Sequence, residues 1–209
     1  MRIPAFMARS SGEGLVCTDG WFRGTVPEIG TKAVPFHDAV SEGIIKENRA
    51  PAIVIDSDSL RNRFFDERVM KKMKIRGADI WFMTHIEDAD DVFDAFNTEA
   101  EMVLAPYHWI RSDADLEDIH GVSDSVIPAV FCNDGKAVTK HGKRTDITSV
   151  LDRLADAGFY KTIVVDVDDS VPRGDWSSIM DDYPSAIPFS RSDRALELGA
   201  KTVISPFDP

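Results

Sequence analysis

The chain has little cysteine, no long apolar run and a shortage of basic side chains. Its 209 residues include two cysteines, Cys17 and Cys132, which are too few for a disulfide framework and are typical of a reducing compartment. No apolar run approaches the roughly 20 residues of a membrane span, and residues 1–7 lack the apolar core of a secretory signal. We therefore expect a cytoplasmic protein that does not interact with a membrane.

The motifs of several common protein classes are missing. No Cys/His spacing is typical of a zinc site, no phosphate-binding Walker loop is found, and no Gly-x-Ser-x-Gly sequence marks a nucleophilic serine. The 24 Lys and Arg residues are outnumbered by 36 Asp and Glu, which gives a net charge of -12. A nucleic-acid-binding surface needs a basic patch, so the charge argues against that partner.

What is present is typical of one folded domain that spans residues 1–209. The hydrophobic fraction of 43% and the charged fraction of 29% are ordinary for a globular protein. Short apolar runs rich in β-branched residues fit parallel strands that are buried on both faces. The eight principal runs are residues 2–7, 52–55, 79–83, 102–105, 126–131, 162–165, 186–189 and 202–204. A further short strand is expected over residues 14–17, closed by a turn at Asp19-Gly20.

Helical patterns separate these runs. Apolar stripes predict helices around residues 36–44, 89–96, 116–119, 147–154 and 195–198. Thr84 to Glu87 resembles a capping box, a helix is expected after Ser112, Asp146 is an expected N-cap, and Gly158 is expected to end a helix. Alternation through eight strands predicts a (β/α)8 barrel, although an open doubly wound sheet has the same local pattern.

An internal repeat favours the barrel. Ile3-Pro-Ala5 matches Ile127-Pro-Ala129, and Ile53–Asp58 matches Ile163–Asp168 in the same order. Ala105-Pro-Tyr-His108 then matches Ser205-Pro-Phe-Asp208 at the end of the fourth strand of each half. These matches predict two half-barrels, at about residues 1–122 and 123–209. The usual last helix is missing after residue 204, so an uncovered wall leads us to expect a homo-oligomer.

Part of the sequence resembles a known barrel family. Val126–Val138, with its Asp134-Gly135-Lys136 turn, resembles the first strand and hairpin of the phosphoribosyl isomerases of histidine biosynthesis (the ProFAR isomerases). Residues 156–168 and 198–204 are similar to the family's second and fourth strands. Residues 12–21 and 86–90 resemble its closing half more faintly. The resemblance implies a barrel whose halves stand in swapped order.

The chain departs from the family where the family does its chemistry. The resemblance places the two catalytic aspartates of the family at Phe131 and Met7, which cannot carry a proton. It places the two glycine-rich phosphate turns at Met83–Ile86 and Phe189–Ser192, which contain no glycine. The resemblance therefore implies an inherited fold without the family's own reaction.

The candidate functional residues follow the strands, because the active sites of such barrels lie at the carboxyl ends of the strands. We expect Asp56, Asp134 and Asp166 to be proton-transfer groups, since crowded carboxylates raise one another's pKa. Additional candidates are Asp58, His85, His108 and Asp168. The carboxylates could instead hold a divalent cation such as magnesium, or each could cap the following helix. Apart from this possible divalent cation, the sequence predicts no cofactor.

Ser190, Arg191 and Ser192 are the predicted anion-binding residues, because hydroxyls and a guanidinium before a helix suit a phosphate or carboxylate. Three functions remain open. The first is an isomerase-like enzyme that acts on a small anionic, phosphorylated metabolite by acid–base chemistry. The second is a non-catalytic binding or assembly protein, and the third is a metal-dependent lyase or hydrolase.

Overall fold

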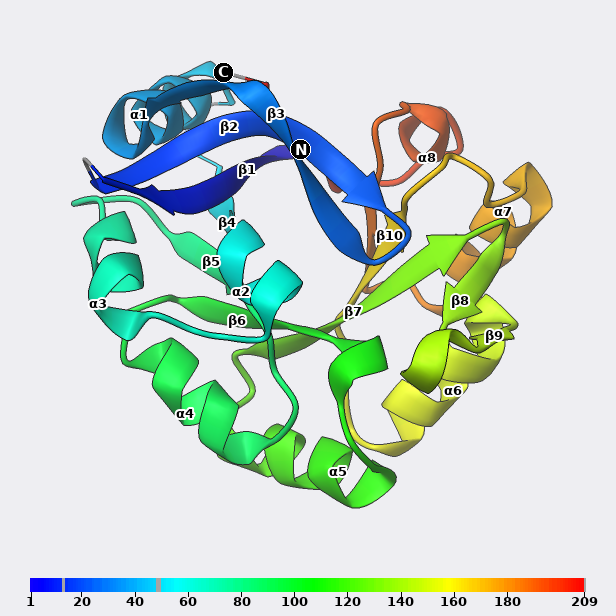
Figure 1. Cartoon of the computed structure of the whole chain (residues 1–209). Coiled ribbons are helices and arrows are strands. Elements are labelled where there is room, and N and C mark those ends of the chain that lie inside the picture. Colours follow the sequence, from blue (N-terminus) through cyan, green and yellow to red (C-terminus); the bar gives the residue numbers. More distant parts are fainter. Residues whose placement is uncertain (13, 48–49, 209) are drawn as a thin grey trace.

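Eight parallel strands close into a barrel in the computed structural model, which describes residues 1–12, 14–47 and 50–208 (Figure 1). Each strand pairs with the next one around the ring, and β7 pairs with β10 to close it. In ring order the strands are β1 (Arg2–Ser11), β4 (Ala52–Asp56), β5 (Ile80–Met83), β6 (Met102–Pro106), β7 (Val126–Asn133), β10 (Thr162–Asp166), β11 (Ala186–Phe189) and β12 (Val203–Pro206). The predicted barrel is confirmed, and the open sheet is wrong.

Helices surround the strands (Figure 1). They are α1 (Phe36–Lys46), α2 (Ser57–Asn62), α3 (Glu67–Met70), α4 (Ala89–Phe96), α5 (Asp113–Val122), α6 (Ile147–Asp156), α7 (Arg173–Asp182) and α8 (Arg194–Glu197). Short 3-10 turns are η1 (Lys71–Met73), η2 (Tyr107–Trp109) and η3 (Lys140–Gly142). No helix within the described residues is long and apolar enough to cross a membrane.

Most predicted helix ends are confirmed. Ser112 caps α5 by accepting the N–H of Asp115, and Gly158 follows α6 with a positive φ of 98°. The capping box at Thr84 is wrong, because α4 begins later. Asp88 is its N-cap and accepts the N–H groups of Asp90 and Asp91.

The alternation of side chains along each strand separates two apolar clusters. In β4, Ile53 and Ile55 belong to the interior of the barrel, whereas Val54 packs in the layer between strands and helices. In β10, Ile163 and Val165 are interior in the same way. Strands β4 and β10 stand four positions apart around the ring, so the matching sequences occupy equivalent places in the two halves.

An antiparallel meander extends from β1, and the predicted short strand over residues 14–17 covers only its beginning. Strand β2 (Gly14–Arg23) pairs with β1 and with β3 (Val26–Pro35). The predicted turn at Asp19-Gly20 is wrong. The ladder only shifts register there, because the Asp19 carboxylate accepts the N–H of Lys32 at 2.8 Å and holds β2 against β3. The hairpin turns instead at Gly24, where φ is +60°.

The second predicted Asp-Gly turn is confirmed. Asp134 and Gly135 have positive φ values of 51° and 69°, as a type I′ turn requires, and they join β7 to β8 (Lys136–Val138). Strand β8 then pairs with β9 (Arg144–Thr145).

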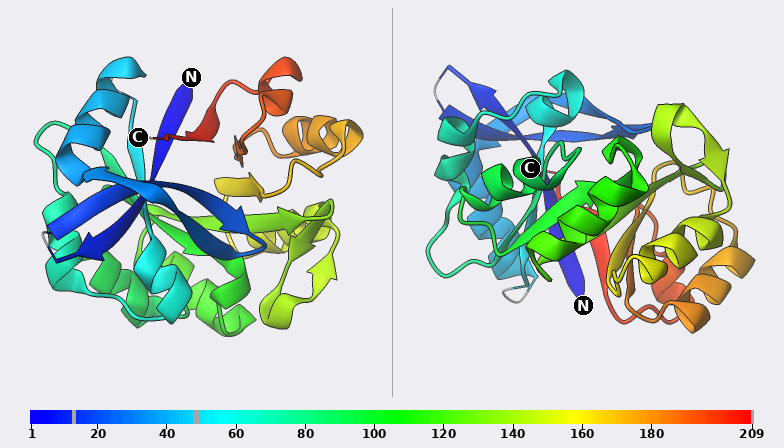
Figure 2. Two further views of the ribbon diagram at one scale, coloured as in Figure 1. Left: turned by 45° about the horizontal axis from the view of Figure 1, so that its top comes forward. Right: turned by 90° about the horizontal axis from the view of Figure 1, so that it is seen from below.

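The β2–β3 hairpin closes the barrel at the carboxyl ends of its strands. Figure 1 shows it running from β1 across that end towards β10, and Figure 2 shows the same crossing from another side. Trp21 meets Phe189 with ring centroids 5.2 Å apart and donates its indole N–H to the Val167 carbonyl at 2.5 Å. Phe22 lies edge-on to Phe131, with centroids 4.8 Å apart. We call Trp21 and Phe22 the aromatic plug, because they fill the mouth of the barrel.

The wall beyond β12 is partly covered by the chain itself. Phe207 packs against Phe6 on β1, with ring centroids 4.8 Å apart. The ammonium group of Lys46, at the end of α1, lies 5.7 Å above the Phe207 ring. Within the described residues α8 is the last helix, so Phe207 takes over part of the covering that a further helix would provide. The homo-oligomer stays a prediction.

Candidate functional site

Asp56 lies at the end of β4 and caps α2. Its carboxylate accepts the N–H of Ser59 at 3.0 Å and the hydroxyl of Thr84 at 3.4 Å. Burial raises the pKa of Asp56 to about 7. The side chain shares the strand face of Val54, which packs towards the helices, and not that of Ile55. Asp56 therefore fixes the junction of β4 with α2 and does not face the centre of the barrel.

Asp166 repeats this arrangement in the second half. Its carboxylate accepts the N–H of Ser170 at 3.0 Å and that of Val171 at 3.3 Å. Burial raises the pKa of Asp166. Burial also opposes ionisation of Asp168, but hydrogen bonds from the Ser170 hydroxyl and the Asp134 N–H outweigh it and lower the pKa of Asp168. Both carboxylates hold the loop that follows β10.

The remaining predicted carboxylates also have partners within the protein. Asp58 accepts the N–H of Ser10 at 2.7 Å, and Asp134 pairs with Arg144 beside the β7–β8 turn. Asp56 and Asp58 thus belong to the β4 end, and Asp134 belongs with Asp166 to the β7–β10 end. Among residues 1–12, 14–47 and 50–208, no three His, Cys, Asp or Glu side chains gather as a metal site would need.

The predicted anion-binding segment packs against the plug. The guanidinium carbon of Arg191 lies 5.5 Å above the ring of Trp21. Ser190 donates its hydroxyl to the Ser192 carbonyl at 2.8 Å, while Asp193 precedes α8 and pairs with Arg2. Anion binding by Ser190, Arg191 and Ser192 stays a prediction.

His85 follows β5 and His108 follows β6, and both imidazole rings contact Trp109. Each imidazole centroid is 5.0 Å from the indole of Trp109. Burial lowers the pKa of both histidines, to about 3 for His108, so His108 is neutral at physiological pH. Cys132 is fully buried and its thiol is free, so it packs as a small apolar residue of the core.

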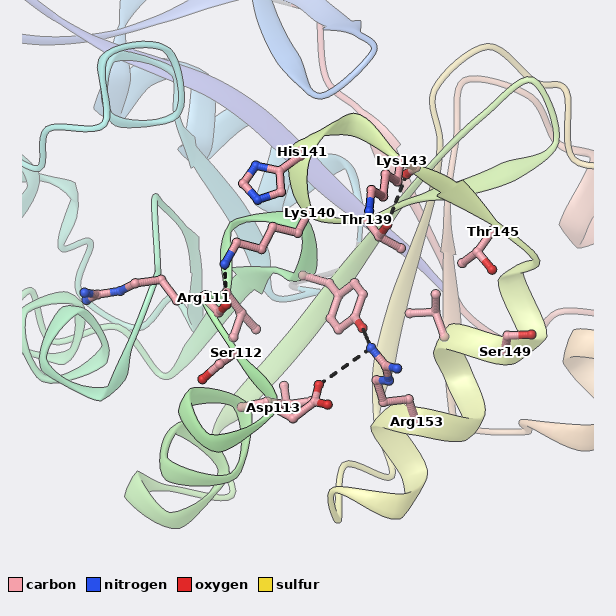
Figure 3. A pocket seen from close by; sticks show the side chains of 14 residues that line it. Arg111, Ser112, Asp113, Thr139, Lys140, His141, Lys143, Thr145, Ser149 and Arg153 are labelled. Atoms are coloured by element: carbon pink, nitrogen blue, oxygen red, sulfur yellow. Dashed lines mark hydrogen bonds and ion pairs between the residues drawn. The ribbon is translucent and has the colours of Figure 1, made fainter.

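A cavity of about 410 Å³ opens at the rim of the barrel, beside the ends of β6 and β8 (Figure 3). We call it the rim cleft. Its basic side chains come from three segments, namely Arg111 before α5, Lys140 and Lys143 around η3, and Arg153 on α6. Hydroxyl groups of Ser112, Thr139, Thr145 and Ser149 also line it.

Hydrogen bonds and ion pairs hold several of these basic side chains in place. Lys140 donates its ammonium group to the Arg111 carbonyl at 2.5 Å, and Arg153 donates to the Tyr107 hydroxyl at 3.3 Å. Figure 3 shows Arg153 reaching towards Asp113, whose carboxylate is 3.6 Å away. In the same view the Arg111 guanidinium extends away from the other labelled side chains.

A second cavity of about 400 Å³ adjoins the first, and we call it the His108 pocket. It shares Arg111, Thr139, Lys140 and His141 with the rim cleft and is also lined by His108 and Trp109. The guanidinium of Arg63 stacks on Trp109, 4.5 Å from the ring centroid. Arg111 extends from here to Glu87 and Asp88, with which it forms ion pairs.

Basic residues concentrate in one segment of the sequence beside the two cavities, away from the strand ends. Residues 136–144 hold Lys136, Lys140, Lys143 and Arg144 in a chain whose net charge is -12. A local count of charge would have marked this basic segment. Comparison of the chain with protein-family models and with curated proteins found no match. The resemblance to the phosphoribosyl isomerases stays a prediction.

Proposed function

We propose that this barrel binds a small organic anion, such as a phosphorylated metabolite, in the rim cleft. One observation carries the proposal. Five Arg and Lys side chains line the rim cleft and the His108 pocket, against two carboxylates, those of Glu87 and Asp113. The whole chain has the opposite balance, with a net charge of -12. Basic groups gathered at one concave place attract and hold an anion.

The chemistry of the lining supports a small ligand with a phosphate or carboxylate group. Guanidinium and ammonium groups form charge-assisted hydrogen bonds with such groups, and serine and threonine hydroxyls can add neutral ones. A cavity of about 410 Å³ lies within the size range of metabolite sites.

Binding without catalysis is the form of the proposal that the contacts favour. Asp56 and Asp166 accept backbone N–H groups of their own loops, and Asp134 pairs with Arg144. The aromatic plug fills the space where a central substrate would lie. The described residues contain no group of three His, Cys, Asp or Glu side chains that could hold a metal ion.

The test removes charge from the rim cleft and from a matched position elsewhere. We expect the double variant Lys140→Gln, Arg153→Gln to bind phosphate and small phosphate esters roughly tenfold more weakly or worse, because each charge-assisted hydrogen bond contributes about 1.5–3 kcal/mol. Isothermal titration calorimetry at about 50 and 200 mM salt would measure it, and wild-type binding should weaken with salt.

The control is the double variant Lys136→Gln, Arg173→Gln, which changes the net charge equally. Both of its side chains form exposed ion pairs, with Asp146 and Glu197, and neither lines the two cavities. Its affinity should equal that of the wild type. Equal losses in both double variants, or no binding of any phosphate or carboxylate by the wild type, would contradict the proposal.

A further inference from the structure

Buried polar atoms without a hydrogen-bond partner gather beside the His108 pocket. The described residues contain eight buried side-chain nitrogen or oxygen atoms of this kind. Three of them are Nδ1 and Nε2 of His108 and Nε1 of Trp109, which are neighbours in the chain. An unsatisfied buried polar group costs about 1–3 kcal/mol, so three in one place call for a partner that fills the adjoining space.

The protein around these atoms offers no such partner. His108 is more than nine-tenths buried, and its ring contacts are the apolar faces of Trp109 and Phe131. Arg63 covers one face of the Trp109 indole, so an aromatic ligand cannot stack there. Both residues line the cavity of about 400 Å³, and because the three nitrogen atoms are themselves covered, a ligand there reaches them by a small rotation of either ring.

We propose that His108 and Trp109 form a subsite that recognises the hydroxyl groups of the bound anion. This inference rests on the proposed function, and it narrows the ligand to a hydroxylated organic anion. A neutral imidazole has one donor and one acceptor nitrogen, and an indole has a donor only. A hydroxyl group both donates and accepts, so it can satisfy each of these atoms. A carboxylate only accepts, so it leaves the acceptor nitrogen of His108 unpaired, and an alkyl chain satisfies none of the three.

The two cavities place such a ligand in one orientation. Lys140 lines both, whereas the Arg111 guanidinium points away from the rim cleft to Glu87 and Asp88. A phosphate or carboxylate held by Lys140 therefore lies next to the His108 pocket. The burial that keeps His108 uncharged suits a neutral group and not a second anionic one. The anionic end therefore lies in the rim cleft, and the hydroxylated end lies against His108 and Trp109.

The experiment compares two ligands that differ in hydroxyl groups alone. We expect the wild type to bind glycerol 3-phosphate at least tenfold more tightly than propyl phosphate, as measured by isothermal titration calorimetry. In the carboxylate series, glycerate and propionate make the same comparison and show which anion the rim cleft prefers. His108→Phe should bring the ratio of the two affinities close to one, because phenyl has a similar shape without polar atoms.

A second variant protects the test against a failure to fold. Trp109→Phe keeps an aromatic ring under Arg63 but removes the N–H, and it should lower the same ratio by several-fold. Equal affinity of the wild type for the hydroxylated and plain anions would overturn this inference while leaving the proposed function intact. Absence of binding by all four compounds would overturn both. An unchanged ratio in a folded His108→Phe variant would also refute the subsite.

Discussion

Replacing Trp21 with alanine is expected to lower the free energy of unfolding by about 3–5 kcal/mol, the range for large aromatic residues that leave a cavity in a core. Trp21 is 8% exposed and packs against Phe189. The Trp21→Ala variant also loses the hydrogen bond from the indole N–H to the Val167 carbonyl. Phe22→Ala should have an effect of similar size, because Phe22 contacts Phe131 and is 5% exposed. Urea denaturation followed by circular dichroism would measure both.

Val26→Ala is the control, since Val26 lies on the same hairpin but is 44% exposed. We expect it to change the free energy of unfolding by about 0.5 kcal/mol or less. Trp21→Phe should fall between the two, because it keeps a ring and loses the N–H. If Trp21→Ala costs no more than Val26→Ala, the hairpin does not close the barrel as described.

The wild type is expected to lose stability as the pH rises towards 7, and the Asp56→Asn variant is expected not to. Burial raises the pKa of the folded Asp56 from 3.8 to about 7. Between these values the unfolded chain has released its proton and the folded chain has kept it, so folding becomes less favourable with rising pH. The loss amounts to up to roughly 4 kcal/mol and is complete above about pH 7.

Asparagine at position 56 can keep the hydrogen bond from the Ser59 N–H, and it has no titratable group. Its carbonyl oxygen can accept the Ser59 N–H, and it carries no charge at any of these pH values. Urea denaturation of both proteins at about pH 4, 6 and 8 should show the variant gaining stability relative to the wild type as the pH rises. The control Asp181→Asn changes an exposed carboxylate on α7 and should run parallel to the wild type. Parallel curves for Asp56→Asn would show that Asp56 is not buried as described.

The barrel could be predicted because its strands carry their own signal. Runs such as Ala52–Ile55 and Thr162–Val165 are short, apolar and rich in β-branched residues, and they stand in equivalent places in the two halves. Helix ends at Ser112 and Gly158 follow from local capping chemistry. Local preferences agree with the final structure at these positions.

The β2–β3 hairpin could not be predicted in the same way. Val26–Pro35 mixes charged residues, two prolines and a glycine, and most of it is exposed. It becomes a strand because β2 pairs with it, and Asp19 then bonds to Lys32 across the ladder. An Asp-Gly pair is a turn signal in isolation, and tertiary pairing overrides it here.

Some residues of the candidate site could likewise be predicted from the sequence, and others could not. An aspartate at a strand end suits a cap and an acid–base group equally, so its residue type could not decide its role. Strand parity could have helped, because Asp56 shares the face of Val54 and not that of Ile55. Arg63, Arg111 and Arg153 are far apart in the sequence, and only the folded barrel brings them to neighbouring cavities.

Because the centre of the barrel is filled, the side chains that stabilise the fold are separate from those that line the two cavities. Stability comes from interior side chains such as Phe131 and Phe189, whereas the two cavities lie outside the ring, among the loops after β6 and β8 and the helices α5 and α6. Under the proposed function, substitutions at exposed lining residues such as Lys143 should change binding without disturbing the packing around Phe131, because these residues lie outside the interior cluster.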